Sequence, residues 1–244
     1  MSNKQASVIA IVNRKGGVGK TTTAKNLSYE LSKMKKKVLV VDMDPQCNCT
    51  KGLIPEDNTP GTILDVLNEK SIERYLLKYN KHMDIIAGDT MLASASESIE
   101  NFTSAIDSVK SKYDYIIIDS SPYFNEITAM ILLATELVII PTFLEVDSLD
   151  GMTTTINEIK ALRDDIDYKI LFTQVNNLKS TEDDLEAIYG VFEEHSFKTL
   201  IRYHRYAPKR ARAKIIPLSK RYKMASVTKD YIALAKELNA QEGF

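Results

Sequence analysis

The sequence predicts a single α/β domain over residues 1–244, with a doubly wound, mostly parallel sheet and helices on both of its faces. Three observations support this fold class. Short apolar runs alternate along the chain with segments of helical composition. A glycine-rich turn follows the first of these runs, and acidic residues follow two of the others. The chain has 244 residues, 44% of them hydrophobic and 27% charged, which is enough for one sizeable buried core.

The apolar runs are expected to be buried strands, because both faces of each run are apolar. Strands that alternate with helices imply parallel pairing through right-handed crossovers. The expected strands are 8–12, 38–41, 85–87, 115–118, 137–140 and 170–172. The expected helices are 22–34, 92–112, 149–162, 181–194 and 224–238.

The turn after the first strand has the composition of a phosphate-binding loop. Backbone N–H groups of such a turn and of the following helix point at one spot and bind a polyphosphate there. The usual pattern is G-x-x-x-x-G-K-[ST], and Gly19, Lys20 and Thr21 supply its end. Position 14 holds Arg where the pattern has its first glycine, and a second lysine, Lys15, follows it. The expected nucleotide-binding residues are Lys15, Gly16, Gly17, Val18, Gly19, Lys20, Thr21 and Thr22.

Acidic residues follow two later strands. Asp42 and Asp44 come directly after the run 38–41, and residues two apart on an extended chain project to the same side. Carboxylates at this place could meet a metal ion, the attacking water or the phosphate-gripping lysine. Asp119 ends the run 115–118, where a single acid suits Mg²⁺, an ion that keeps several waters and binds few carboxylates. Thr21 and Asp119, the latter through a water, are the expected Mg²⁺ ligands.

Together these three segments resemble the deviant Walker A, Walker A′ and Walker B motifs of the ParA/MinD family of ATPases, in the family's order. The resemblance covers nearly the whole chain and is nearest to the short, Soj-like members. It implies a P-loop NTPase fold and Mg²⁺-dependent hydrolysis of ATP to ADP and phosphate. By this resemblance, Lys20 would grip the phosphates of its own nucleotide, and Lys15 would reach the nucleotide of a partner subunit. Asp44 would position or polarise the water, and Asp42 would support the loop and the metal shell.

Two segments depart from the family's pattern. The family usually continues its Walker B strand as D-x-P-P, whereas here Ser121 precedes Pro122. Cys47 and Cys49 stand where the family commonly has small residues, as in G-N-A-T. These are the chain's only two cysteines, and we expect reduced thiols next to the site, where thiol modification could inhibit.

The net charge of −1 hides a segregated basic segment. Residues 196–229 contain eleven Lys and Arg and no Asp or Glu, so all 33 acidic residues lie elsewhere. Basic residues interleaved with tyrosines suit phosphate contacts without base readout, although an ordinary solvated basic face is the simpler alternative. The expected DNA-binding residues are Arg202, Arg205, Lys209, Arg210, Arg212, Lys214, Lys220 and Arg221.

The sequence therefore predicts a partitioning ATPase. Its ATP-bound homodimer would bind nonspecific double-stranded DNA and dissociate when a ParB-like centromere-binding protein stimulates hydrolysis. Two alternatives stay open: a MinD-like ATPase that positions another cargo, and a nucleotide-gated DNA-binding regulator whose hydrolysis is incidental. MinD ends in a basic amphipathic helix that lies on membrane, whereas residues 237–244 here are weakly acidic. No apolar stretch reaches membrane-spanning length, so we expect a cytoplasmic, nucleoid-associated protein without a membrane partner.

Overall fold

A single sheet of eight strands runs through the molecule in the order β3-β4-β2-β5-β1-β6-β7-β8. Only the edge strand β3 is antiparallel to its neighbour in this sheet. The structure is a computed structural model that describes residues 5–54, 59–69, 71–94, 99–143, 146–175, 190–213 and 216–241. The strands are β1 (Ser7–Ile11), β2 (Val38–Met43), β3 (Leu77–Asn80), β4 (Met83–Ile86), β5 (Tyr115–Ser120), β6 (Leu137–Phe143), β7 (Asp167–Val175) and β8 (Ile201–Arg202).

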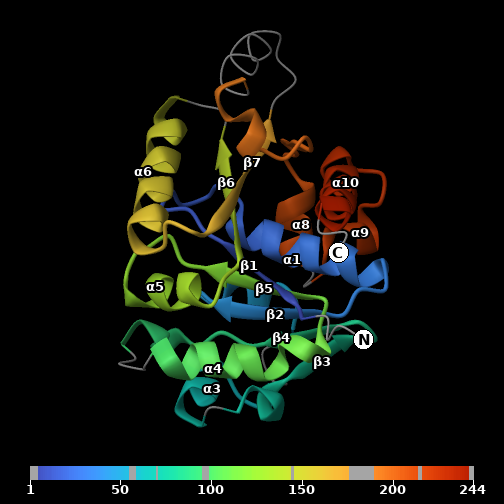
Figure 1. The fold of residues 1–244 in the computed structure, drawn as a ribbon. Helices are drawn as coiled ribbons and strands as arrows, with labels where there is room; N and C mark the ends of the chain where they lie inside the picture. Colours follow the sequence, from blue (N-terminus) through green and yellow to red (C-terminus); the bar gives the residue numbers. More distant parts are fainter. Residues whose placement is uncertain are drawn as a thin grey trace.

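Helices cover both faces of this sheet (Figure 1). On one face lie α3 (Ile63–Glu69), α4 (Ile99–Val109), α5 (Glu126–Leu133) and α6 (Val146–Leu162). On the other lie α1 (Lys20–Lys33), α8 (Ala207–Ala213), α9 (Leu218–Arg221) and α10 (Ser226–Gln241). Short elements complete the chain: α2 (Asn48–Lys51), η1 (Ile72–Tyr75), η2 (Thr90–Ser94), η3 (Lys110–Lys112) and η5 (Glu193–His195). The predicted doubly wound α/β fold is confirmed.

The strands alternate their side chains between two cores, as the two-residue period of a strand requires. Ile9 and Ile11 face the core under α1 and α10, whereas Val8 and Ala10 face the core under α4 to α6. All four side chains are fully buried. This double burial explains why the central strands read as continuous apolar runs.

All six predicted strands are present, with ends that differ by a few residues. The sequence did not predict β3 and β8, because β3 is partly exposed and polar and β8 has only two residues. The expected helix 92–112 is shorter, since α4 spans Ile99–Val109 between two 3₁₀ turns. Most of the expected helix 181–194 lies outside the described residues. Among the described helices, none is long and apolar enough to cross a lipid bilayer.

The first and last helices of the chain pack against each other on the sheet. Leu27 and Leu31 of α1 share a core with Leu234 and Leu238 of α10, and all four are fully buried. The hydroxyl groups of Thr23 on α1 and Tyr231 on α10 hydrogen bond at 3.2 Å inside this contact. The C-terminal helix therefore fixes the position of the helix that follows the glycine-rich loop.

Candidate nucleotide-binding site

The order of the central strands brings three functional segments together at one edge of the sheet. Strand β5 lies between β2 and β1, and the three are parallel. Their register pairs Asp42 of β2 with Asp119 of β5, and Asp119 with Ile11 at the end of β1. The glycine-rich loop 12–19 follows β1 directly. Open parallel sheets bind ligands at the carboxyl ends of their strands, so the loop and both acids lie where a ligand is expected.

The loop turns sharply because two of its glycines have left-handed backbone angles. Gly17 has φ 78° and Gly19 has φ 98°, values that other residues rarely adopt. Gly19 immediately precedes α1, so the first N–H groups of that helix are available to an anion. Strand β7 supports the loop from below, since the Thr173 hydroxyl donates to the Val18 carbonyl at 2.8 Å.

A pocket of about 470 Å³ opens above this loop. Its size suits a nucleotide-sized ligand. Two predicted residues do not line it: Val18 is buried, and Lys15 is bonded to α6. The lining consists of Gly16, Gly17, Gly19, Lys20, Thr21, Thr22, Lys25, Asn26, Asp44, Gln46, Asn48, Pro122, Pro208, Lys209, Ala211 and Leu218.

The side chain of Lys20 is folded against the loop. Its ammonium donates to the carbonyl oxygens of Asn13 at 2.8 Å and Lys15 at 3.2 Å. Burial lowers the pKa of Lys20, while the charges of Asp119 and Asp44 raise it. A buried ammonium whose hydrogen bonds go to loop carbonyls can exchange them for bonds to an anionic ligand, so Lys20 is suited to hold phosphate.

The two acids after β2 have different surroundings. Asp42 is fully buried, and its carboxylate accepts hydrogen bonds from the Thr50 N–H at 2.8 Å, the Thr50 hydroxyl at 2.7 Å and the Asp44 N–H at 3.2 Å. Burial raises its pKa to about 6 despite these bonds. Asp44 lines the pocket and accepts a hydrogen bond from the Gln46 N–H at 2.9 Å. Asp44 can therefore touch a bound ligand, whereas Asp42 holds the turn that presents Asp44.

Asp119 fits a role in binding Mg²⁺. Both of its carboxylate oxygens are buried, and neither has a well-formed hydrogen bond, although the Thr21 hydroxyl is close enough to lower the pKa. Burial is the larger effect, and together with the charge of Asp42 it raises the pKa of Asp119 well above its usual value. Mg²⁺ takes hydroxyl, carboxylate and phosphate oxygens, so Thr21 and Asp119 would complete its shell beside a bound nucleotide. Within the described ranges, no group of three His, Cys, Asp or Glu residues is arranged to hold a metal ion.

The two cysteines are poor nucleophiles. Burial and the nearby Asp42 charge raise the pKa of Cys47 to about 11, and burial raises that of Cys49 well above its usual value. Thiolates are therefore scarce at neutral pH, which argues against a redox role. At the other departure from the family's pattern, the Ser121 hydroxyl accepts a hydrogen bond from the Tyr123 N–H at 3.3 Å and so helps to shape that turn.

The basic segment lies next to the pocket, although it is distant in the sequence. Pro208, Lys209 and Ala211 of α8 line the pocket together with residues of the loop. Lys209 therefore belongs both to the basic segment and to the lining of the pocket. Its substitution would perturb both surfaces.

The remaining basic residues differ in how freely their side chains could contact DNA. Arg202 is paired with Asp230 of α10, to which its side chain and its backbone N–H both donate, the latter at 2.9 Å. Arg205 and Arg210 are exposed, and their guanidinium groups lie 5.4 and 5.3 Å from the ring centre of Tyr206. Lys220 lies 4.6 Å from the ring centre of Tyr79, and Arg221 is exposed. The side chain of Arg212 and all of Lys214 lie outside the described residues.

Several residues that shape the site were not predicted from the sequence motifs. Asn13 holds the loop, since its side-chain amide donates to the Pro141 carbonyl at 2.7 Å and its amide oxygen accepts from the Lys15 N–H at 2.8 Å. Asn26 on α1 accepts from the Leu218 N–H at 2.8 Å and so ties α9 to the pocket. Only Asn13, which directly follows the first apolar run, had a position that could have suggested its role.

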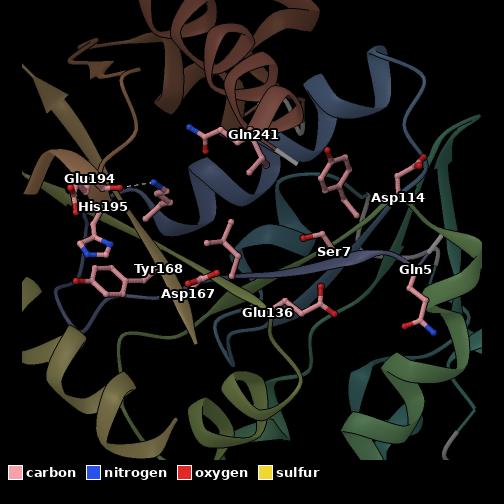
Figure 2. Close-up of a pocket in the computed structure, with 13 residues that line it drawn as sticks. Gln5, Ser7, Asp114, Glu136, Asp167, Tyr168, Glu194, His195 and Gln241 are labelled. Carbon is pink, nitrogen blue, oxygen red and sulfur yellow. Dashed lines mark hydrogen bonds between the residues drawn. The ribbon is translucent and has the colours of Figure 1, made fainter. Parts of the chain in front are cut away.

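A larger pocket, of about 870 Å³, lies at the opposite edge of the sheet. Figure 2 shows the side chains that line it, among them Ser7, Glu136 and Asp167 at the amino ends of β1, β6 and β7. His195 stacks on Tyr168 there, with ring centres 4.6 Å apart. None of the predicted site residues lines this pocket, so it is separate from the glycine-rich loop.

The fold and the site define a nucleotide-binding protein of the P-loop class with a second lysine in its loop. Residues 6–172 match the family described as "AAA domain". The "Sporulation initiation inhibitor protein Soj" of Bacillus subtilis is 32% identical over 253 residues, covering 96% of this chain and 98% of that protein. The "Chromosome partitioning protein ParA" of Myxococcus xanthus is 34% identical over 210 residues, covering 80% of this chain and 74% of that protein.

Solved structures agree with this assignment of the fold. The MinC:MinD cell division protein complex of Aquifex aeolicus aligns with a TM-score of 0.84 at 23% identity, covering 96% of both chains. The chain belongs to the ParA/MinD family of P-loop ATPases, as its motifs predict, and is a partitioning or positioning ATPase by family.

Replacing Lys20 with Ala is expected to weaken ATP binding about 100-fold, because it removes a charge-assisted contact at the centre of the loop. Isothermal titration calorimetry with ATP and Mg²⁺ measures the change. Lys33→Ala, in the last turn of the same helix, is the control and should bind normally. ATP affinity that survives Lys20→Ala would contradict the position of the phosphates.

Asp119→Asn should stabilise the nucleotide-free protein by about 1–3 kcal/mol at pH 8, because at that pH it removes the cost of burying a carboxyl group that is ionised in the unfolded chain. A carboxyl whose pKa is raised on folding binds its proton more tightly in the native state. The wild type should therefore gain stability as the pH falls from 8 toward the ordinary carboxyl pKa near 3.8, and Asp119→Asn should gain less. Thermal unfolding at pH 8 and pH 6 without Mg²⁺ measures both effects, with Asp107→Asn on α4 as an exposed control. An unchanged pH response in Asp119→Asn would refute the raised pKa.

Proposed function

We propose that the protein is an ATP-dependent DNA-partitioning ATPase whose ATP-bound homodimer binds DNA without sequence preference. The observation that carries the proposal is that two segments line the same pocket. Residues of the glycine-rich loop line it, and so do Pro208 and Lys209 of α8, which belongs to the basic segment. A nucleotide held in the pocket would touch both, so its presence would bear directly on the basic segment.

The chemistry of the site supports hydrolysis by positioning and electrostatics. The loop N–H groups and Lys20 would hold the phosphates, and Mg²⁺ held by Thr21 and Asp119 would neutralise part of their charge. Asp44 lines the pocket and would orient the attacking water. Asp42 would act through Asp44, whose N–H it fixes at 3.2 Å. The products would be ADP and phosphate, without a covalent intermediate.

The position of Lys15 supports the proposed homodimer. It lies in the same loop as Lys20 but does not line the pocket of its own subunit. A loop lysine directed away from its own ligand site suits a contact with the phosphates of a facing subunit. Two basic segments would then meet DNA together, and the doubled number of phosphate contacts would make binding depend on ATP.

The charge of the basic segment favours DNA over the alternatives. Its residues Arg205, Arg210 and Arg221 are exposed, and no Asp or Glu occurs along the sequence 196–229. A ParB-like centromere-binding protein would stimulate hydrolysis and release the dimer, which would place the protein on the nucleoid in the cytoplasm. A MinD-like positioning ATPase for another cargo would instead bind vesicles or a cargo protein. A nucleotide-gated DNA-binding regulator would bind DNA with full affinity even when it does not hydrolyse ATP.

Asp44→Ala should bind ATP and dimerise normally but hydrolyse it about 100-fold more slowly, because the water loses a positioning carboxylate. Steady-state phosphate release and light scattering with ATP measure turnover and dimer. Asp44→Asn keeps an acceptor for the Gln46 N–H and serves as the control for the turn. It should be slow as well, since the charge is missing. Wild-type turnover in either variant would assign the water to another residue.

DNA binding should require ATP and weaken steeply with salt through counterion release. Replacing Arg205, Arg210 and Arg221 with Ala removes two sets of contacts in the dimer and should reduce the slope of log K against log salt by about 5, equally on two unrelated duplexes. Lys112→Ala on η3, outside the segment, is the matched control. Arg202→Ala should instead lower thermal stability, because it leaves Asp230 unpaired. A strong preference for one duplex, or equal binding with ADP and ATP, would overturn the model.

A further inference from the structure

The first residues of the glycine-rich loop are docked on the segment that contains the end of β6 and helix α6. The Asn13 side chain bonds to the Pro141 carbonyl. The Arg14 N–H donates to the Thr155 hydroxyl at 3.4 Å, and the Arg14 guanidinium is paired with Glu158. Arg14 stands where the usual phosphate-loop pattern has glycine, so this side chain adds a tether that a glycine could not make.

Lys15 continues this docking with its side chain. Its ammonium donates to the Ser148 hydroxyl at 2.7 Å and lies 5.4 Å from the ring centre of Phe143. Ser148 is fully buried in the first turn of α6, and its carbonyl accepts from the Thr142 hydroxyl at 3.3 Å. The acceptor for Lys15 is therefore held in a fixed place by the protein core.

We propose that Ser148 is a positioning residue for Lys15, and that Ser148 and Phe143 form a resting seat for the ammonium within its own subunit. The seat consists of the Ser148 hydroxyl and the Phe143 ring. This inference rests on the proposed function of Lys15 at a partner's nucleotide. The ammonium cannot occupy the seat and the partner's phosphates together, so leaving the seat is a step in pairing of the subunits.

The chemistry of the seat suits a contact that must be given up. A hydroxyl and an aromatic ring attract an ammonium without carrying a negative charge. A triphosphate offers full negative charges and can therefore compete for Lys15. The contacts of Asn13 and of the Arg14 backbone do not involve the Lys15 ammonium, so they need not break when it leaves the seat. The contacts in the seat must be broken before the subunits pair, so they make the free energy of pairing less favourable.

The seat can be tested without nucleotide by the reactivity of lysines toward an amine-acylating reagent. Ser148→Ala should speed acylation of Lys15 about tenfold, because the ammonium loses its hydrogen bond and becomes more accessible. The protein is acylated while it is intact and folded. Mass spectrometry of its peptides then gives the rate at Lys15 relative to the rate at exposed Lys33. Thr154→Ala, which removes an exposed hydroxyl of the same helix, should leave the rate unchanged. An unchanged rate in Ser148→Ala would overturn the seat.

The consequence for pairing is tested with a non-hydrolysable ATP analogue and Mg²⁺. Ser148→Ala should lower the dimer dissociation constant about tenfold in analytical ultracentrifugation. Phe143→Leu, which keeps apolar volume but removes the ring, should shift it in the same direction by a smaller factor. Thr154→Ala is again the control. Faster acylation with an unchanged dissociation constant in both seat variants would overturn the claim that the seat opposes pairing.

The background variant Lys15→Ala separates this inference from the proposed function. If Lys15→Ala pairs as well as the wild type, the proposed role of Lys15 fails, while the acylation rates still decide whether the seat exists. If Lys15→Ala fails to pair, the dissociation constant of Ser148→Ala decides the inference. In that case Ser148→Ala should change the acylation rate and the dissociation constant together, and a changed dissociation constant with an unchanged acylation rate would mean that Ser148 acts through the packing of α6.

Discussion

The parallel register of β2, β5 and β1 is the constraint on which the rest of the site depends. It sets Asp42 beside Asp119 and places both next to the end of β1, where the loop begins. The two carboxyl groups are fully buried at the same level of the sheet. Such a pair is costly when both are ionised, and Lys20 and a bound cation are the natural counter-charges. The loop, the lysine and the metal site therefore belong to one electrostatic arrangement.

Without a ligand, the groups that would hold one make bonds to neutral partners of the protein. Lys20 donates to loop carbonyls, and Lys15 donates to a serine hydroxyl. These contacts order the side chains in advance, so less conformational entropy is lost on binding. They are also weaker than contacts with phosphate, so they do not block it. The site is thus ordered and still receptive.

Local patterns in the sequence predicted the central strands and the glycine-rich loop. The central strands were evident because burial on both faces makes each of them a short apolar run, and the loop was evident because Gly17 and Gly19 need backbone angles that other residues avoid. The edge strands β3 and β8 had no such signal, since β3 is partly exposed and polar and β8 is two residues long.

Local sequence patterns could not predict the contacts between segments that are distant in the chain. The return of α8 over the pocket depends on Ala207 and Ala211 packing into a core with residues of α1, and two alanines make no distinctive pattern. The pairing of Arg202 with Asp230 joins residues 28 positions apart, and only the fold brings them together. The direction of the Lys15 side chain is set by Ser148, which no motif marks. Sequence spacing therefore identifies the ligand-holding groups better than it identifies what holds those groups.

The buried bond between Thr23 and Tyr231 extends the reach of the site to the last helix of the fold. Thr23 lies two residues after Thr21, so the first turn of α1 and the middle of α10 share one rigid contact. A change in the packing of α10 would shift the start of α1 and with it the donors that face the phosphates. Variants with altered nucleotide affinity should therefore occur along the inner face of α10, whose Tyr231 lies 208 residues after Thr23 in the sequence.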